Sequence, residues 1–285
     1  MERGKKKALP SQRSHDRYKD IESMIRPSMP SYERWLGIER VDKFPKDISA
    51  VLSQAQFLSL RDEKIIVQLS DLGIGNMGEL RECWIEGSQA MKLVFDIGAH
   101  DLAQCQPVLR RLEKLRISKL MKLTNICIGS GILKEGSFGS LKHLQLEYCP
   151  QVVTIFSSAV RLESLEVLEI KFCARLEEIF AAKVNAEGSL GRLHTLCLLE
   201  LPTLKNIAHN LQLASLKMAH VKGCPELRKL PLHSNTGFIN CNKIASSLEV
   251  TGESKWWEQL EWEDENVKRH ISFNSWKPFR LPKQS

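Results

Sequence analysis

One spacing of apolar residues recurs along the chain, and this repeat restricts the possible fold more than any other feature. In the stretch LEVLEIKFCARLEEIF, residues 165–180, leucine and isoleucine first alternate and then recur three apart around Cys173. The same spacing returns in other stretches: AQFLSLRDEKII (55–66), LRECWIEGSQAMKLV (80–94), LEKLRISKLMKLTNI (112–126), LKHLQLEYCPQV (141–152), LHTLCLLELPTLKNI (193–207) and LKMAHVKGCPELRKL (216–230). Repetition at a nearly fixed period predicts stacked coils rather than a single globular core.

The position that Cys173 occupies in its stretch gives the period. The equivalent positions are 63, 88, 120, 149, 173, 201 and 224, so successive repeats are 25, 32, 29, 24, 28 and 23 residues apart. Most of these steps fall within the 20 to 29 residues typical of leucine-rich repeats. The sequence therefore predicts an α/β leucine-rich-repeat solenoid of about seven repeats, with a curved parallel sheet and an irregular convex side.

The spacing also predicts which way the side chains of one coil point. In a strand the residues of the L-x-L pattern point inward, and their neighbours point to the opposite face. The residue in the Cys173 position is expected to be small and buried where the chain turns away from the strand. The prolines after three of these positions, Pro150, Pro202 and Pro225, suit the end of a strand because proline has no N–H to donate.

Composition divides the chain into three predicted segments. Residues 1–19 carry seven Lys and Arg against two acidic residues, which accounts for five of the seven net positive charges of the 285-residue chain. We predict a basic, partly disordered segment at 1–50, the solenoid at 51–232, and a cap with tail at 233–285. In the cap, Trp256, Trp257 and Leu260 fall on one face of an expected helix. Acidic neighbours argue against the alternative, an aromatic platform for nucleic-acid bases.

No arrangement of residues in the sequence indicates a catalytic, cofactor-binding or metal-binding site. No nucleophile, base and carboxylate recur at a useful spacing, so we expect a non-enzyme with no catalytic, cofactor or metal site. Eight cysteines without a CxxC pair predict reduced thiols, although a redox role for Cys105 or Cys127 stays open. No apolar run reaches the ~18 residues of a membrane span. We predict a cytoplasmic protein, with nuclear targeting through the lysine run GKKK as an alternative to a merely solvated arm.

Taken together, LEVLEIKFCARLEEIF, LHTLCLLELPTLKNI, VKGCPELRKLPLHS and the terminal WWEQLEWEDENVKRHI resemble the C-terminal leucine-rich repeats of plant coiled-coil NLR disease-resistance receptors. The resemblance covers roughly residues 50–275. It implies a non-catalytic recognition module in plant innate immunity that takes part in effector sensing or autoinhibition. A P-loop is missing, since GIGNMG has no Lys-Ser/Thr after it, so the nucleotide-binding domain of such receptors is expected to be absent from this chain.

The outward side chains of the strands are the predicted partner-binding residues. We expect them on the concave face: Trp84, Glu86, Arg116, His143, Gln145, Glu147, Tyr148, Glu169, Lys171, Phe172, Leu199, His220 and Lys222. Large aromatics among mixed charges are typical of interface anchors, but packing between coils could also occupy them. The resemblance implies a protein partner, namely a pathogen effector, a guarded host protein or a receptor's nucleotide-binding domain. Neither nucleic acid nor membrane is expected. An adaptor such as a ubiquitin-ligase substrate receptor is the alternative.

Overall fold

A computed structural model describes residues 32–96, 107–128, 136–156, 161–181, 190–208, 211, 213–232, 248–262 and 265–276. The chain divides into the units Met1–Glu33 and Arg34–Ser285. Every helix and strand given below belongs to the second unit.

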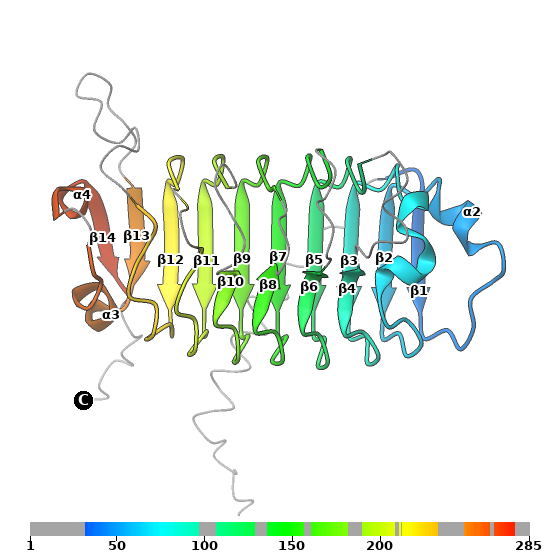
Figure 1. The fold of residues 1–285 in the computed structure, drawn as a ribbon, viewed down its shortest axis with the longest axis horizontal. Coiled ribbons are helices and arrows are strands. Elements are labelled where there is room, and N and C mark those ends of the chain that lie inside the picture. Colours follow the sequence, from blue (N-terminus) through cyan, green and yellow to red (C-terminus); the bar gives the residue numbers. More distant parts are fainter. Residues whose placement is uncertain are drawn as a thin grey trace, which may run out of the picture. The chain divides into compact units, whose positions relative to one another are not determined.

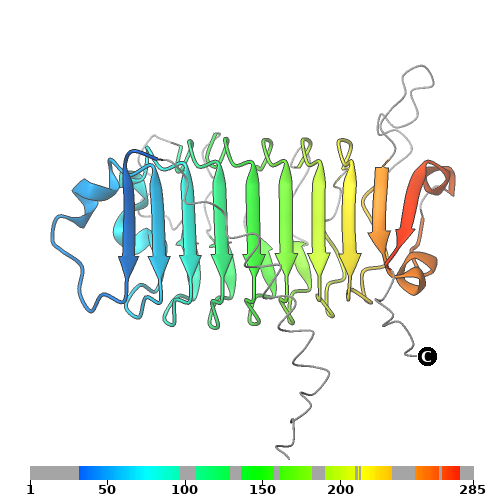
Figure 2. The same cartoon turned by 180° about the vertical axis from the view of Figure 1, so that it is seen from behind.

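Ten parallel strands form the main sheet of this unit, in the order β1-β2-β3-β5-β7-β9-β11-β12-β13-β14 (Figures 1 and 2). Each strand contributes five residues from one coil. The bounds are β1 Trp35–Glu39, β2 Phe57–Arg61, β3 Glu82–Glu86, β5 Lys114–Ser118, β7 His143–Glu147, β9 Val167–Lys171, β11 Thr195–Leu199, β12 Met218–Lys222, β13 Leu248–Gly252 and β14 Ile271–Ser275. Neighbouring strands pair without a register shift from β1 to β12, so equivalent residues of successive coils lie side by side.

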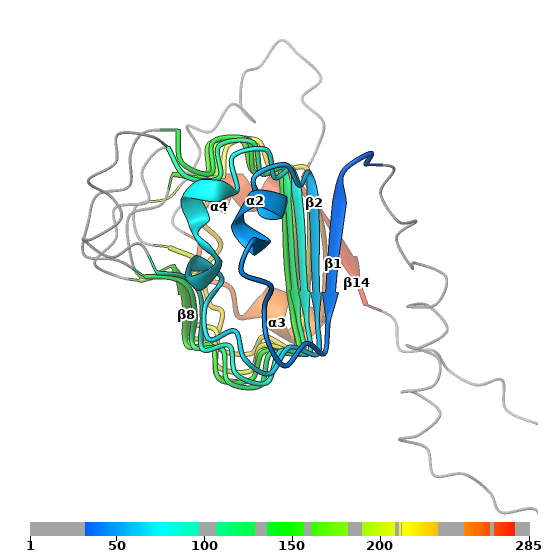
Figure 3. The same ribbon diagram turned by 90° about the vertical axis from the view of Figure 1, so that its right-hand side faces the viewer.

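A second parallel sheet, in the order β10-β8-β6-β4, lines the return side of the middle coils (Figure 3). Its strands are β4 Leu93–Asp96, β6 Asn125–Ile128, β8 Thr154–Phe156 and β10 Glu178–Phe180. The described helices are short: α2 Ile48–Leu52, α3 Ser254–Glu258, α4 Glu265–Arg269, and the 3-10 helices η1 Leu69–Leu72 and η2 Ile74–Asn76. The structure confirms the leucine-rich-repeat solenoid and shows that strands rather than helices form much of its return side.

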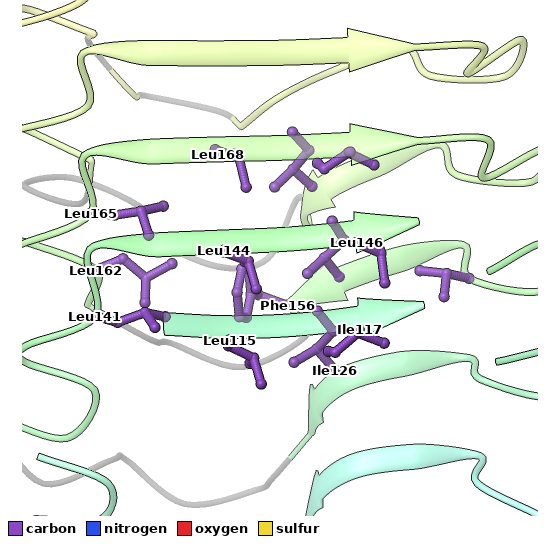
Figure 4. Close-up of a cluster of buried hydrophobic side chains, with 14 of the residues drawn as sticks. Leu115, Ile117, Ile126, Leu141, Leu144, Leu146, Phe156, Leu162, Leu165 and Leu168 are labelled. Atoms are coloured by element: carbon purple, nitrogen blue, oxygen red, sulfur yellow. The ribbon is translucent and has the colours of Figure 1, made fainter. Parts of the chain in front are cut away.

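The leucines of successive coils merge into one core. In the main-sheet strands from β1 to β12 the second and fourth residues point inward, as Leu144 and Leu146 do on β7, where both are fully buried. Figure 4 shows them in rows with Leu115 and Ile117 of the preceding coil. Packing of this kind makes each coil depend on its neighbours for burial of its apolar face.

The seven turn positions derived from the sequence each lie two residues after a strand of the main sheet. Those occupied by cysteine are buried: Cys149 and Cys173 have no exposed surface and Cys224 is 1% exposed. Their thiols donate to the backbone carbonyl two residues earlier, at 3.4 Å in each case. The sequence interpretation of this position as a buried turn residue is therefore correct.

The main sheet extends beyond the predicted solenoid limits of 51 and 232. Strand β1 lies inside the predicted 1–50 segment and pairs with β2 from Trp35 to Glu39. Strands β13 and β14 lie inside the predicted cap and continue the sheet from β12. Helix α3 does bury Trp256, whose Nε1 donates to the Leu227 carbonyl at 2.9 Å. The repeat was missed at 33–41 because Glu33 stands where the pattern has leucine.

Candidate functional site

We define the outer face by the first, third and fifth residues of β1, β2, β3, β5, β7, β9, β11 and β12. Eleven of the thirteen predicted binding residues lie there: Trp84, Glu86, Arg116, His143, Gln145, Glu147, Glu169, Lys171, Leu199, His220 and Lys222. All are partly exposed except Glu147, which is only 8% exposed. The unbroken register brings residues far apart in sequence onto one continuous surface.

The other two predicted residues, Tyr148 and Phe172, lie in what we call the turn row, formed by the residue that directly follows each of these strands. Both have positive φ, 52° and 56°. A side chain costs about 1–2 kcal/mol in this left-handed conformation. Their rings stack with centroids 4.5 Å apart and planes 6° apart. Two coils therefore present one flat, partly exposed aromatic pair beside the outer face.

A second aromatic group lies on the outer face nearer the N-terminal end of the sheet. The Trp84 ring meets Phe57 edge to face at 5.1 Å, and the Arg116 guanidinium lies 5.7 Å from the Trp84 ring centroid. The Trp84 Nε1 donates to Glu82 Oε1 at 2.8 Å. Burial, hydrogen bonding and cation–π contact together fix the orientation of the indole.

A charged group occupies the centre of the outer face. Glu169 Oε2 lies 2.6 Å from Lys171 Nζ, and Glu169 Oε1 lies 3.5 Å from His143 Nε2, which is an ion-pair distance without hydrogen-bond geometry. The contact with His143, and then those with Lys171, lower the pKa of the Glu169 carboxyl to about 2 against the burial that opposes them. This carboxylate remains ionised at any physiological pH.

Burial keeps several thiols protonated in the described part of the chain. Burial raises the pKa of Cys83, Cys173 and Cys224 to about 12, and that of the partly exposed Cys197 to about 11. Because the thiolate is the reactive form, these groups are poor nucleophiles near neutral pH. Cys127 is buried on β6, while Cys105 lies outside the described residues.

The described residues contain neither a candidate metal site nor a candidate membrane span. No group of three or more His, Cys, Asp and Glu in that part of the chain is arranged to hold a metal ion. None of the helices described above is long and apolar enough to cross a membrane.

Sequence reasoning missed two aromatic residues at this surface: Trp276, which is exposed, and Phe57, which is only 1% exposed and packs edge to face against Trp84. Phe57 is the first residue of β2, and Trp276 directly follows β14 with its ring 5.1 Å from Lys222 Nζ. Phe57 was not predicted because the first repeat matches the pattern only weakly. The alternation of Ile271 and Phe273 was a usable signal for a strand before Trp276, but the Trp-rich segment upstream directed attention to a helix.

Parts of this chain are similar in sequence to known leucine-rich-repeat proteins. The family described as "Plant disease resistance protein RPS2-like, leucine-rich repeats" matches residues 111–244. Disease resistance protein RPS5 of Arabidopsis thaliana is 39% identical over 88 residues, 30% of this chain and 9% of that protein. A second protein of the same plant is 39% identical over 81 residues, 28% of this chain and 9% of its own length. The chain thus aligns with only a small part of these relatives.

Among solved structures, the leucine-rich repeat domain of the type III effector XopL is similar over 81% of this chain and 83% of that domain, at 18% identity and a TM-score of 0.44. The repeat spacing, the parallel solenoid and the sequence matches agree on the class of repeat. The chain carries leucine-rich repeats, and residues 111–244 are similar to those of plant disease resistance proteins.

Proposed function

We propose that this chain is a non-catalytic protein-recognition module of plant immunity, and that it binds its partner through the outer face and the adjoining turn row. Within a disease-resistance receptor such a module would serve effector sensing or autoinhibition, in the cytoplasm or nucleus. The partner would be a pathogen effector, a guarded host protein or a receptor's nucleotide-binding domain.

The stacked pair of Tyr148 and Phe172 is the observation that carries this proposal. Aromatic side chains that remain partly exposed on a rigid scaffold are common anchors of protein interfaces. Both rings are held in a left-handed backbone conformation that repeats along the turn row, so little side-chain freedom is left to lose on binding. The mixed charge of the surrounding outer face supplies the polar rim of such an interface.

Affinity capture from leaf extract with two variants tests the proposal. The test variant is Phe172→Ala, which removes half of the stacked pair. The matched control is Met121→Ala, which removes an apolar side chain that is 53% exposed but lies beyond the turn after β5, off the outer face. Circular dichroism and the melting temperature establish that both variants remain folded.

We expect the wild-type chain and Met121→Ala to retain the same proteins and Phe172→Ala to lose them. Equal capture by all three chains would contradict binding through this surface. Mass spectrometry of the retained proteins separates the two functional classes: recovery of ubiquitin-ligase scaffold subunits without immune receptors or effectors would favour the adaptor alternative.

A further inference from the structure

The cationic side chains of the outer face and turn row differ in whether a carboxylate of the chain pairs with them. These surfaces carry seven lysines and arginines. Five of them lie within 4 Å of a carboxylate: Arg40–Asp62 at 3.0 Å, Arg61–Glu86 at 3.9 Å, Lys114–Glu82 at 3.9 Å, Lys119–Glu86 at 2.8 Å and Lys171–Glu169 at 2.6 Å. Most positive charge on this surface is therefore neutralised within the chain.

The remaining two cations, Arg116 and Lys222, make no ion pair with any described residue. Each is instead held by an aromatic ring: the Arg116 guanidinium by Trp84, and the Lys222 ammonium by Trp276. A ring face orients a cation but leaves its N–H donors available. Both side chains are partly exposed, so an incoming carboxylate can reach them.

The register of the sheet fixes the distance between these two cations. Arg116 is the third residue of β5 and Lys222 the fifth residue of β12, four strand spacings apart in the sheet order. With strands about 4.8 Å apart and residues about 3.3 Å apart along a strand, the two positions are roughly 20 Å from each other. An extended peptide covers this distance in about six residues.

The strands between the two cations present both charged and uncharged side chains to such a peptide: β7 contributes Gln145 and Glu147, and β9 contributes the Glu169–Lys171 ion pair. Strand β11 places Thr195, Cys197 and Leu199 on the outer face, and the Tyr148–Phe172 pair borders it in the turn row. In an extended chain, residues i, i+2, i+4 and i+6 point to the same side. A segment with acidic residues at i and i+6 and uncharged residues between them matches the spacing of Arg116 and Lys222, and it places no third carboxylate beside Glu147 and Glu169.

We propose that the outer face recognises an extended acidic segment of a protein partner, which crosses the strands and places carboxylates on Arg116 and Lys222. This inference rests on the proposed function and specifies the chemistry of the partner. It also distinguishes this surface from a nucleic-acid site, because a nucleic acid brings a phosphate with every nucleotide, whereas only two of the seven cations lack an ion pair with a described residue.

A defined synthetic peptide tests the inference on the full chain. The probe is fluorescein-labelled Ser-Glu-Ser-Leu-Ser-Leu-Ser-Glu-Ser, and the matched probe replaces both glutamates by lysine. Binding is followed by fluorescence anisotropy at about 50 mM and 300 mM salt. We expect saturable binding of the acidic peptide that weakens at high salt, and no binding of the lysine peptide.

Three variants locate the contact. Arg116→Gln and Lys222→Gln should each weaken the acidic peptide about threefold, and the double variant about tenfold, which is the scale of partly exposed ion pairs. The control Lys205→Gln removes an equal charge on the return side, where Lys205 pairs with Glu177 at 2.8 Å beside β10, and should leave the affinity unchanged. An equal loss of affinity in Arg116→Gln, Lys222→Gln and the control would overturn the inference. Equal binding of both peptides, or no saturation by the acidic peptide, would also overturn it.

The leaf-extract experiment separates failure of this inference from failure of the proposed function. If Phe172→Ala abolishes capture but the acidic peptide competes no better than the lysine peptide, the recognition surface stands and its acidic partner does not. If the acidic peptide releases the captured proteins and the lysine peptide does not, both proposals are supported.

Discussion

Replacing the buried turn cysteine by serine tests the idea that this position stabilises each coil without taking part in binding. Cys173 has no exposed surface, and its Sγ donates to the Lys171 carbonyl at 3.4 Å. In Cys173→Ser the shorter bond from Cβ to oxygen leaves the hydroxyl farther from that carbonyl than the hydrogen bond requires. A buried hydroxyl with an imperfect partner costs about 1–2 kcal/mol.

Urea unfolding followed by circular dichroism and by tryptophan fluorescence measures this cost. With an m-value of about 2 kcal/mol/M, the midpoint should fall by roughly 0.5–1 M. Cys197→Ser is the matched control, because this thiol is partly exposed on β11 and its replacement should change the stability by less than about 0.5 kcal/mol. Coincident curves from the two probes would establish that the coils unfold together.

The reasoning would be refuted if Cys173→Ser kept the wild-type midpoint while Cys197→Ser lowered it. That outcome would mean that burial at the turn position contributes nothing to the stability of the coil. A loss of partner binding in Cys173→Ser at unchanged stability would also contradict the assignment, since it would give the cysteine a functional role.

Three further predictions follow from the same structure. Gly223→Ala should lower the unfolding free energy by about 1–2 kcal/mol, because φ is +65° and the new Cβ would lie 2.7 Å from a carboxylate oxygen of the preceding coil. Gly78→Ala is the control, because the space around its Cβ is open. Equal effects of the two substitutions in thermal melts would contradict the prediction. Peptide-resolved alkylation of the native chain at pH 8 should label Cys197 slowly and Cys173 only after unfolding, whereas rapid labelling of Cys173 would show that the coil opens. The contact with His143 is the main cause that lowers the pKa of Glu169 from 4.5 to about 2. The ionised carboxylate therefore contributes stability that is fully present above pH 4.5 and is lost as the pH falls toward 2. Glu169→Gln should flatten this pH dependence in urea unfolding between pH 6 and pH 3, and an unchanged slope would argue against the ion pair.

The sequence predicted the repeated part of the fold because the physics of one coil fixes its spacing. Leucines two apart must point to the same side of a strand, and the turn position comes three residues after the second leucine, so the strand bounds could be placed wherever the leucines are present. The ends of the sheet lack this signal. Before strand β1, Glu33 stands in a leucine position of the pattern, and β13 and β14 carry Val250 and Phe273 within a segment rich in tryptophan.

The outer face was predictable as a set of residues, but its internal contacts were not. Alternation along each strand identifies which side chains point outward. It does not show that Glu147 is nearly covered, or that Lys222 meets Trp276, which lies 54 residues further along the chain. These contacts depend on rotamers and on how strands beyond the recognised repeats add to the sheet.

Site-specific photo-crosslinking tests most directly the claim that the outer face and turn row form the binding surface. Benzoylphenylalanine replaces Phe172 in one chain and Met121 in another, and each chain is irradiated in leaf extract. The account predicts a discrete crosslinked protein from position 172 and none from position 121. Crosslinks from position 121 alone, or from neither position while the extract still supplies captured proteins, would contradict it.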